Sequence, residues 1–423
     1  MASGIVDRLI EKGVQIPNPG AVTVGEEVHL DRISTNGVVL FPGCRITGAS
    51  TLILDDVLIG AEGPVFLENC RVGAQTALSA GSFSGSVFLG QNRVGPGAQF
   101  REGTILEEAA SAAHCVGLKQ TILFPFVTLG SLINFCDCLM AGGTGPKDHS
   151  EVGSSFVHFN FTPNQDKATA SLVGDVPRGV MLDQRPIFLG GQGGMVGPCR
   201  VAFGTVTASG TILRKDVRHP DRLVFDAPRR SFNAPNTPGL YRNVRRIVQN
   251  NLHYIASLKA LEAWYTHFRR RFFSKPMPAL LWEGLCETLA GNIDERVRRM
   301  SQFVEKLPES LKIYRRLMED AASPKVAVEK NELIERWPSL AEALRRPADD
   351  FDAPKLRDRF FKAAGGKPGT GCIEAVRSLS ADARGAGTAW LQGVMERVEA
   401  EAYGALASFA PKGAAQPGPE NHR

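Results

Sequence analysis

The chain has 423 residues, of which 43% are hydrophobic and 22% charged, and its formal net charge is +5 at pH 7. This length suffices for two or three domains, and the composition excludes a disordered or fibrous chain. The small net charge gives no support to nucleic-acid or membrane binding, and no apolar run reaches the about 18 residues that span a bilayer. Because the N-terminus lacks a signal sequence, we predict a cytoplasmic protein.

Charge and aromatic residues divide the chain into two parts. Residues 1–215 carry 15 Lys/Arg and 18 Asp/Glu, whereas the rest carries 34 and 26. All four tryptophans and all five tyrosines follow residue 240. This difference predicts two separately built units. The eight cysteines include no C-x-x-C pair, so we predict reduced thiols and no metal site.

The chain is predicted to begin with a short amphipathic helix over 3–14, part of an N-terminal cap over 1–20. From residue 21 to 215, aliphatic and aromatic residues recur every six positions. The four ladders of this period are Leu40, Ile46, Leu52 and Leu58; Phe66, Val72 and Leu78; Phe88, Val94, Phe100 and Leu106; and Leu123, Leu129 and Phe135.

A period of six fits neither an α-helix nor a simple alternating strand. It is typical of a triangular coil in which each face takes six residues and points one side chain inward. We therefore predict a left-handed parallel β-helix of hexapeptide repeats. The period slips between 106 and 123 and between 136 and 172, and such slips predict loops that leave the coil and carry chemistry.

The proline-rich residues 216–239 are predicted to be a linker. The period then becomes 3.6, which predicts an all-α domain over 240–408. Its helices are expected over 240–274, 279–305, 309–322, 326–346, 353–364 and 371–408. The last residues, 409–423, are polar and rich in Pro and Gly, which predicts a disordered tail.

A basic run, Arg269-Arg270-Arg271, lies among phenylalanines in the helical domain. Such a run could bind an acidic partner, so the helical domain could have a protein partner. The interpretation we favour is a solvated helix end whose cations interact with the helix dipole.

The most specific motif is HFNFTPNQDKATASLVGD over 158–175. It resembles N-Y-D-G-x-N-K-x-x-T-x-I-G-D of the acetyltransferase domain in the bifunctional N-acetylglucosamine-1-phosphate uridyltransferase/glucosamine-1-phosphate acetyltransferase family. Asn160 and Phe161 match the Asn-Tyr pair, Gln165 the second Asn, and Thr169 the Thr. Upstream, REGTILEEAASAAHCVG over 101–117 resembles the segment before the family's catalytic histidine.

The resemblance implies an acetyl-CoA-dependent N-acyltransferase acting on an amino sugar phosphate or a nucleotide amino sugar. It makes His114 the general base, since a histidine, with an ordinary pKa of about 6.5, can accept a proton from the attacking amine near neutral pH. It also implies a homotrimer with sites between subunits. The implied substrate-binding residues are Arg101, Asn134, Asn160, Phe161 and Lys167, and the implied cofactor-binding residues are Lys119 and Gln165.

The chain departs from the family pattern in several places. Gly117 stands where the family has a substrate-contacting Tyr, and Asp166 replaces a Lys that is found one step on, as Lys167. About thirteen residues, 141–153, are inserted before the Asn160 loop. The uridyltransferase half has no counterpart, so a pyrophosphorylase activity is the least favoured interpretation.

Other interpretations of these residues stay open at this stage. His149 and His158 are rival general bases, and Asn134 and Asn160 could instead satisfy backbone amides at the corners of the coil. A different class of function is also open, namely a non-catalytic β-helix scaffold or sugar-nucleotide-binding protein.

Overall fold

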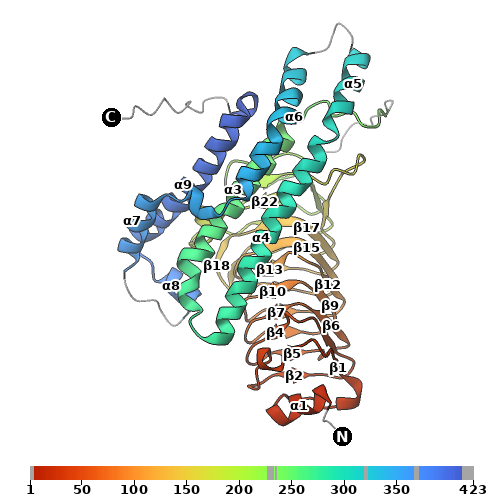
Figure 1. Ribbon diagram of the computed structural model, residues 1–423, viewed down its shortest axis with the longest axis vertical. Helices are drawn as coiled ribbons and strands as arrows, with labels where there is room; N and C mark the ends of the chain where they lie inside the picture. The colour runs from red at the N-terminus through yellow and green to blue at the C-terminus, as the bar shows by residue number, and fades with distance from the viewer. Residues whose placement is uncertain (1–3, 226–232, 234–235, 319–322, 366–370, 412–423) are drawn as a thin grey trace.

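The computed structural model describes residues 4–225, 233, 236–318, 323–365 and 371–411 (Figure 1). Residues 23–224 form a parallel β-solenoid of triangular coils, and helices of the C-terminal part pack along its side. The predicted left-handed parallel β-helix followed by a helical region is therefore confirmed. A short helix, α1 (Ile5–Lys12), precedes the first coil.

One side of the solenoid, the first face, is a parallel ten-stranded sheet. Each strand is short, because each coil must turn a corner after a few residues. The strands are β2 (Val39–Leu40), β5 (Leu58–Ile59), β8 (Ala77–Leu78), β11 (Arg93–Val94), β14 (Ser111–Ala112), β16 (Thr128–Leu129), β20 (Glu151–Val152), β23 (Phe188–Leu189), β26 (Val206–Thr207) and β28 (Leu223–Val224).

The second face lies next along each coil and belongs to a sixteen-stranded sheet. Its strands are β1 (Thr23–Val24), β3 (Arg45–Thr47), β6 (Val65–Glu68), β9 (Gly81–Ser84), β12 (Ala98–Phe100), β21 (Val157–Phe159), β24 (Gly194–Val196), β27 (Ile212–Leu213) and the first halves of β15 (Val116–Leu123) and β17 (Ile133–Met140). The third face comprises β4 (Leu52–Ile53), β7 (Arg71–Val72), β10 (Ser86–Phe88), β13 (Thr104–Leu106), β22 (Ser171–Val173), β25 (Arg200–Val201) and the second halves of β15 and β17.

The strands β15 and β17 thus bend around the edge between the second and third faces. Gln120 and Asp137 lie at this bend with φ of 52° and 57°. The left-handed conformation turns the chain sharply, and it directs the side chains at the bend outward from the coil.

The solenoid core contains most of the predicted ladder residues, among them Phe88 and Phe100, whose rings stack at 6.0 Å. Two predictions are wrong. Leu58 and Phe66 are 37% and 52% exposed, while the following residues Ile59 and Leu67 are buried. The register aligns Ile46 with Leu67 and Ile53 with Val72, so the step from Ile46 to Ile53 is one residue longer than the period and the step from Leu67 to Val72 is one shorter. A shift of one residue moves a strand side chain to the opposite face.

The helical region comprises α3 (Arg245–Ala263), a π-helical turn (Trp264–Phe268), a 3-10 turn (Arg269–Phe272), α4 (Pro276–Val304), α5 (Leu307–Met318), α6 (Pro324–Arg345), α7 (Pro354–Ala364), α8 (Cys372–Arg377) and α9 (Ala381–Ala405). The helix predicted over 371–408 is broken. Ser380 caps the start of α9 by accepting a hydrogen bond from the backbone N–H of Ala383, so α8 and α9 are separate. The end of the helix predicted over 309–322 and most of the predicted tail lie outside the described residues.

The helix α4 runs along the solenoid and packs against β7, β10 and β13 of the third face (Figure 1). Gly284 lies against the Arg71 side chain, where a Cβ atom would be only 2.3 Å from Arg71 Nε. The residues predicted to form a linker also contain β28, which pairs with β26 and lengthens the first face beyond residue 215.

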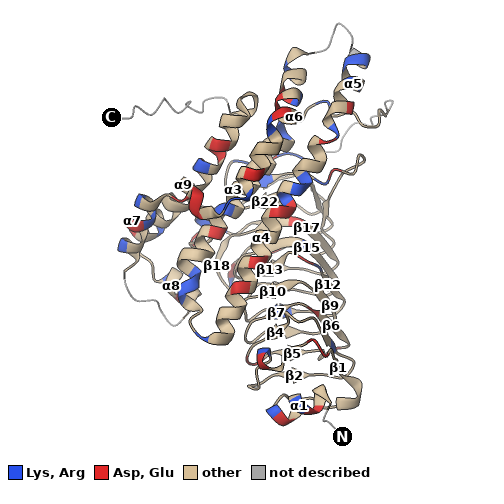
Figure 2. Ribbon diagram, viewed as in Figure 1, with Lys and Arg blue, Asp and Glu red and all other residues tan. Residues whose placement is uncertain are grey.

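Charged residues are dense on the helices and sparse along the solenoid (Figure 2). Along α4 the acidic residues come first and the basic residues follow; they are Glu283, Glu287, Asp294 and Glu295, then Arg296, Arg298 and Arg299. None of the helices in the described ranges contains a stretch long and apolar enough to cross a membrane.

Candidate functional site

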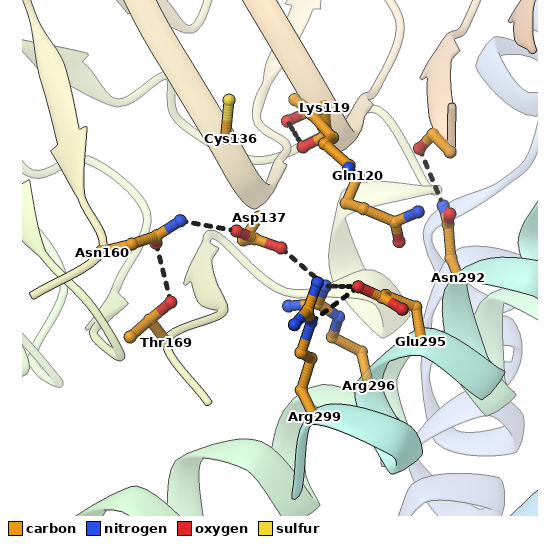
Figure 3. A network of polar contacts seen from close by, with 12 residues as sticks. Lys119, Gln120, Cys136, Asp137, Asn160, Thr169, Asn292, Glu295, Arg296 and Arg299 are labelled. Carbon is orange, nitrogen blue, oxygen red and sulfur yellow. Dashed lines mark hydrogen bonds and ion pairs between the residues drawn. The ribbon is translucent and has the colours of Figure 1, made fainter. Parts of the chain in front are cut away.

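A pocket of about 320 Å³ opens at the edge between the second and third faces, beside α4. The bent strands β15 and β17 form its floor, β21 and the loop after it form one wall, and α4 forms the other (Figure 3). Its lining residues are Arg101, Lys119, Asn134, Cys136, Asp137, Val157, His158, Phe159, Asn160, Lys167, Glu295 and Arg299.

Five of the seven predicted binding residues line this one pocket, although they come from four different segments of the chain. They are Arg101, Lys119, Asn134, Asn160 and Lys167. The parallel register explains the convergence, since Gly117–Lys119 of β15 pairs directly with Asn134–Cys136 of β17.

The pocket has an excess of positive charge. Four lining residues are cationic and two, Asp137 and Glu295, are acidic. The ammonium groups of Lys119 and Lys167 form no ion pair or hydrogen bond with any residue that the structure describes. Cations that lack an anion within the protein favour binding of an anionic ligand such as a phosphate group.

The Cys136 thiol also faces the pocket, with Arg101 Nη2 3.9 Å from its sulfur. Burial is the main cause that raises the pKa of this thiol, followed by the neighbouring Asp137 carboxylate. The group is therefore a neutral thiol at neutral pH and a poor nucleophile. It donates a hydrogen bond to Asn134 Oδ1 at 3.0 Å.

A network of charged and amide groups connects the floor of the pocket with both of its walls (Figure 3). Asp137 Oδ1 lies 2.6 Å from Arg296 Nη2 of α4, and Asp137 Oδ2 accepts a hydrogen bond from Asn160 Nδ2 at 2.8 Å. Thr169 Oγ1 donates to Asn160 Oδ1 at 2.7 Å. Burial acts to raise the pKa of Asp137, but the Arg296 guanidinium and the Asn160 amide hold it below its ordinary value. Both polar atoms of the Asn160 side chain thus serve the network, which holds this residue in place at the pocket.

His158, one of the rival bases, is only 3% exposed and lies with its ring edge-on to Phe135. The Ser171 hydroxyl accepts a hydrogen bond from the Cys199 backbone N–H and so can donate to His158 Nε2, 2.8 Å away. Burial lowers the pKa of His158 to about 4, although the Asp137 carboxylate acts in the opposite direction. A buried ring that stays neutral and bonded through Nε2 is a structural residue rather than a general base.

This buried histidine predicts a loss of stability in acid. Because the folded pKa of about 4 lies below the ordinary value of 6.5, the unfolded chain binds the proton first as pH falls. The resulting contribution to the free energy of unfolding is about 3 kcal/mol. It is complete above pH 6.5 and is lost as the pH falls from 6.5 to 4. Urea unfolding from pH 7.5 to 4.5 is expected to show a shallower fall for His158→Asn than for the unmodified chain. The control His149→Asn should keep the original slope, and a His158→Asn profile parallel to the original would contradict the expectation.

His149 lies in the inserted segment, which forms a hairpin of β18 (Gly143–Gly145) and β19 (Asp148–His149). Its Nδ1 is 2.9 Å from the Pro146 carbonyl oxygen, and it does not line the pocket. The guanidinium of Arg377 from α8 donates to the Thr144 carbonyl oxygen, so the hairpin contacts the helical region.

His114 lies outside the pocket, at the edge between the first and second faces. Its side chain is exposed, and its Nδ1 is 2.8 Å from Ser131 Oγ in the next coil. If the Ser131 hydroxyl accepts the hydrogen bond from Nδ1–H, Nε2 of His114 carries no proton. It can then accept one, as a general base requires. His114 and Lys119 are five positions apart, so at most about 17 Å of chain separates them. The chain turns the edge at Cys115, whose φ is 57°, before β15 begins at Val116.

The outer surface of β15 between these two residues is open at Gly117. A Cβ atom there would meet nothing closer than the Ile133 carbonyl oxygen at 3.9 Å and Asn134 Oδ1 at 4.0 Å. The departure from the family's Tyr thus leaves room along the second face, between the exposed imidazole of His114 and the pocket.

The remaining predicted residues lie in the loop after β21, away from the pocket lining. Phe161 is 73% exposed, and Gln165 is exposed with φ of 61°. The aromatic residue that lines the pocket is Phe159. Asp166, the other departure from the family, is buried and accepts a hydrogen bond from Tyr241 Oη at 2.5 Å, which ties the loop to the helical region.

The sequence interpretation missed the contribution of α4. Asn292, Glu295 and Arg299 recur at helical spacing, and Asn292 Nδ2 donates to the Gly103 carbonyl oxygen of the solenoid at 3.0 Å. The signal for this face was a polar stripe at i, i+3 and i+7 in a segment whose other stripe is apolar.

Comparison with known proteins shows similarity to one group. Over 228 residues, 54% of the chain, the identity with the bifunctional protein GlmU of Nocardia farcinica is 28%, and the match covers 41% of that protein. The GlmU of Thermotoga maritima is 24% identical over 212 residues, and that of Burkholderia vietnamiensis 28% over 214, each over 50% of the chain and 42% of the relative. The chain thus spans less than half the length of these relatives, and no protein-family model matches it. With the solenoid fold, the similarity confirms the resemblance to the β-helix acetyltransferase domain that the motifs indicated.

Proposed function

We propose that the chain is a coenzyme A-dependent N-acyltransferase whose acceptor is an amino sugar bearing a phosphate or a nucleotide. The proposal starts from the similarity of half the chain to GlmU proteins over a β-helix. The observation that carries it is the convergence of Arg101, Lys119 and Lys167 on one pocket. Cations at a pocket wall bind the phosphate oxygens of a sugar phosphate and fix its orientation.

The open surface over Gly117 gives the acceptor a path from the pocket towards His114. With its phosphate near Lys119, the acceptor would lie along the second face beside Asn134, whose exposed amide could hydrogen-bond a sugar hydroxyl. A separation of up to about 17 Å favours the longer predicted acceptor, a nucleotide-linked amino sugar.

In the proposed reaction the amine nitrogen of the acceptor attacks the carbonyl carbon of the acetyl thioester. A C–N bond forms, the C–S bond breaks, and the coenzyme leaves as its thiol. His114 Nε2 accepts the proton that the amine loses, and that proton then returns to the leaving sulfur. Backbone N–H groups at the coil edge could stabilise the developing oxyanion.

A second candidate is a nucleotide-sugar-binding protein without catalysis. It is favoured by the separation of His114 from the pocket, whose own histidine, His158, is buried and neutral. Tight nucleotide-sugar binding without thiol release from acetyl-CoA, tested with several amines, would support this candidate.

Filling the path over Gly117 tests the proposal. Purified protein is mixed with acetyl-CoA and either glucosamine 1-phosphate or a UDP-amino sugar, and free thiol is followed. Gly117→Phe is expected to lower kcat/KM by about 100-fold, because an aromatic ring displaces the acceptor from its reactive position. Gly117 lies in extended backbone with open space above it, so the variant should fold.

The matched control is Gly385→Phe, since Gly385 is an exposed glycine of α9 whose Cβ would also meet open space. This variant should keep the original rate. Equal rates for Gly117→Phe and the original chain would contradict the proposed path of the acceptor over Gly117.

A further inference from the structure

We propose that Arg299 of α4 binds the anionic group of the acceptor, so that the ligand bridges the solenoid and the helical region. This inference rests on the proposed function, because it assigns the second wall of the same pocket. The resemblance to the family implies donors from two subunits of a trimer. Here one wall of the pocket that Lys119 and Lys167 line comes from a helix of the same chain.

The Arg299 side chain is held ready for a ligand. Its Nε donates to Glu295 Oε1 at 2.8 Å, and its Nη1 donates to Gln302 Oε1 at 3.0 Å. A guanidinium has five N–H donors, so three remain without a partner among the described residues. The side chain is only 16% exposed and lines the pocket, where an anionic ligand could accept hydrogen bonds from these donors.

The neighbouring Glu295 does not cancel this charge for a ligand. Its Oε1 is engaged by Arg299, and its Oε2 accepts from Arg298 Nε at 2.9 Å. These contacts hold the pKa of Glu295 below its ordinary value, although burial acts to raise it. Two guanidinium groups therefore surround one carboxylate, and the cluster keeps a net positive charge.

The position of α4 relative to the pocket floor is fixed by two contacts. Arg296, next to Glu295 on the helix, pairs with Asp137 at 2.6 Å and compensates this acidic group of the pocket floor. Asn292, one turn earlier, bonds to the Gly103 carbonyl oxygen. Arg299 is thus held at the pocket that Lys119 also lines, where an anionic ligand could pair with both cations.

The test compares two arginines of the same helix that share a partner. Arg298 and Arg299 both pair with Glu295, but only Arg299 lines the pocket. Binding of inorganic phosphate, glucosamine 1-phosphate and a UDP-amino sugar is measured by titration calorimetry at low salt. Arg299→Ala is expected to weaken binding of the phosphate-bearing ligands about 10- to 100-fold. Arg298→Ala should weaken it much less, by no more than about 3-fold, because Arg298 contributes charge to the cluster but does not line the pocket. Arg299→Lys should restore part of the loss.

The outcomes separate this inference from the proposed function. Equal affinities for Arg299→Ala and Arg298→Ala, in a chain that still transfers the acetyl group, would overturn the role of Arg299 alone. A loss specific to Arg299→Ala without any thiol release would support the inference and contradict the acyltransferase. Absence of binding of all three ligands to the unmodified chain would contradict both. Thermal unfolding of each variant establishes that a loss of affinity does not come from unfolding.

Discussion

Replacing Arg269 with alanine is expected to lower the free energy of unfolding by about 3–5 kcal/mol, because it leaves buried carboxylates without a counter-charge. The Arg269 side chain is 2% exposed and pairs with Glu107, 1% exposed, at 2.5 Å and with Glu108 at 2.7 Å. Tyr265 Oη also donates to Glu107 Oε1 at 2.5 Å. Both carboxylates belong to the solenoid, so this cluster holds the helical region against it.

The loss of unfolding free energy in Arg269→Ala should depend on pH in a defined direction. Burial raises the pKa of Glu107 in the folded chain above its ordinary value of 4.5, and the Arg269 guanidinium opposes this rise. Without Arg269 the folded carboxyl binds its proton at still higher pH than the unfolded one, so the variant is most stable in acid and loses stability as pH rises. The difference from the unmodified chain is therefore expected to be larger at pH 8 than at pH 5.

Urea unfolding at these two pH values measures both effects. The matched control is Arg271→Ala, since the Arg271 guanidinium lies 5.5 Å from the Phe361 ring centre and forms no ion pair within the described residues. A contact of this kind contributes about 0.5–1 kcal/mol. If Arg269→Ala were no more destabilising than Arg271→Ala, the cluster would not stabilise the contact between the two parts.

The same cluster corrects the interpretation of the basic run. The favoured prediction, a solvated helix end, is wrong for Arg269, which is buried, while Arg270 is exposed and stacks 4.4 Å from the Trp282 ring centre. The acidic partner of Arg269 is Glu107 of this same chain, about 160 residues earlier. Charge along the sequence gives no information on such a pairing, because it depends on how the helices pack on the third face.

The fold was largely predictable because its signal is local. A coil packs its inward side chain against the next coil, so the six-residue period appears directly in the sequence. The errors arise where turn length changes, since nothing in the ladders around Leu58 and Phe66 shows that one step of the coil is longer than six residues and another shorter. The break before Ser380 was missed because capping competes with an otherwise continuous helical pattern.

The site was predictable only where it belongs to the solenoid. Arg101, Lys119 and Asn134 could be placed because the motif resemblance covers the coils that carry them. Glu295 and Arg299 could not, because their role comes from the packing of α4 beside β15 and β17. Asp166 was read as the loss of a ligand contact, whereas its hydrogen bond to Tyr241 gives it a structural role that depends on the helical region.

Replacing His114 with alanine is expected to lower kcat for thiol release by about 10²–10⁴-fold, the usual contribution of a general base. KM for the acceptor should change little, because the cations that would bind it lie in the pocket, which His114 does not line. Ser131→Ala is expected to cost less, about 10-fold, since the Ser131 hydroxyl orients the imidazole without accepting the amine's proton. The measurement is steady-state kinetics with saturating acetyl-CoA and varied acceptor.

The control for this substitution is His149→Ala, which removes an imidazole from the β18–β19 hairpin, outside the pocket lining. It should leave both kcat and KM unchanged. An unchanged kcat in His114→Ala would show that no proton passes through this imidazole, and the reaction would then need a base within the pocket. The groups there that could be tested next are few, because His158 is buried and neutral and Asp137 is paired with Arg296. A loss of kcat at constant KM, by contrast, would place proton transfer at the His114 end of the path over Gly117 and binding at the other, as the separation along β15 requires.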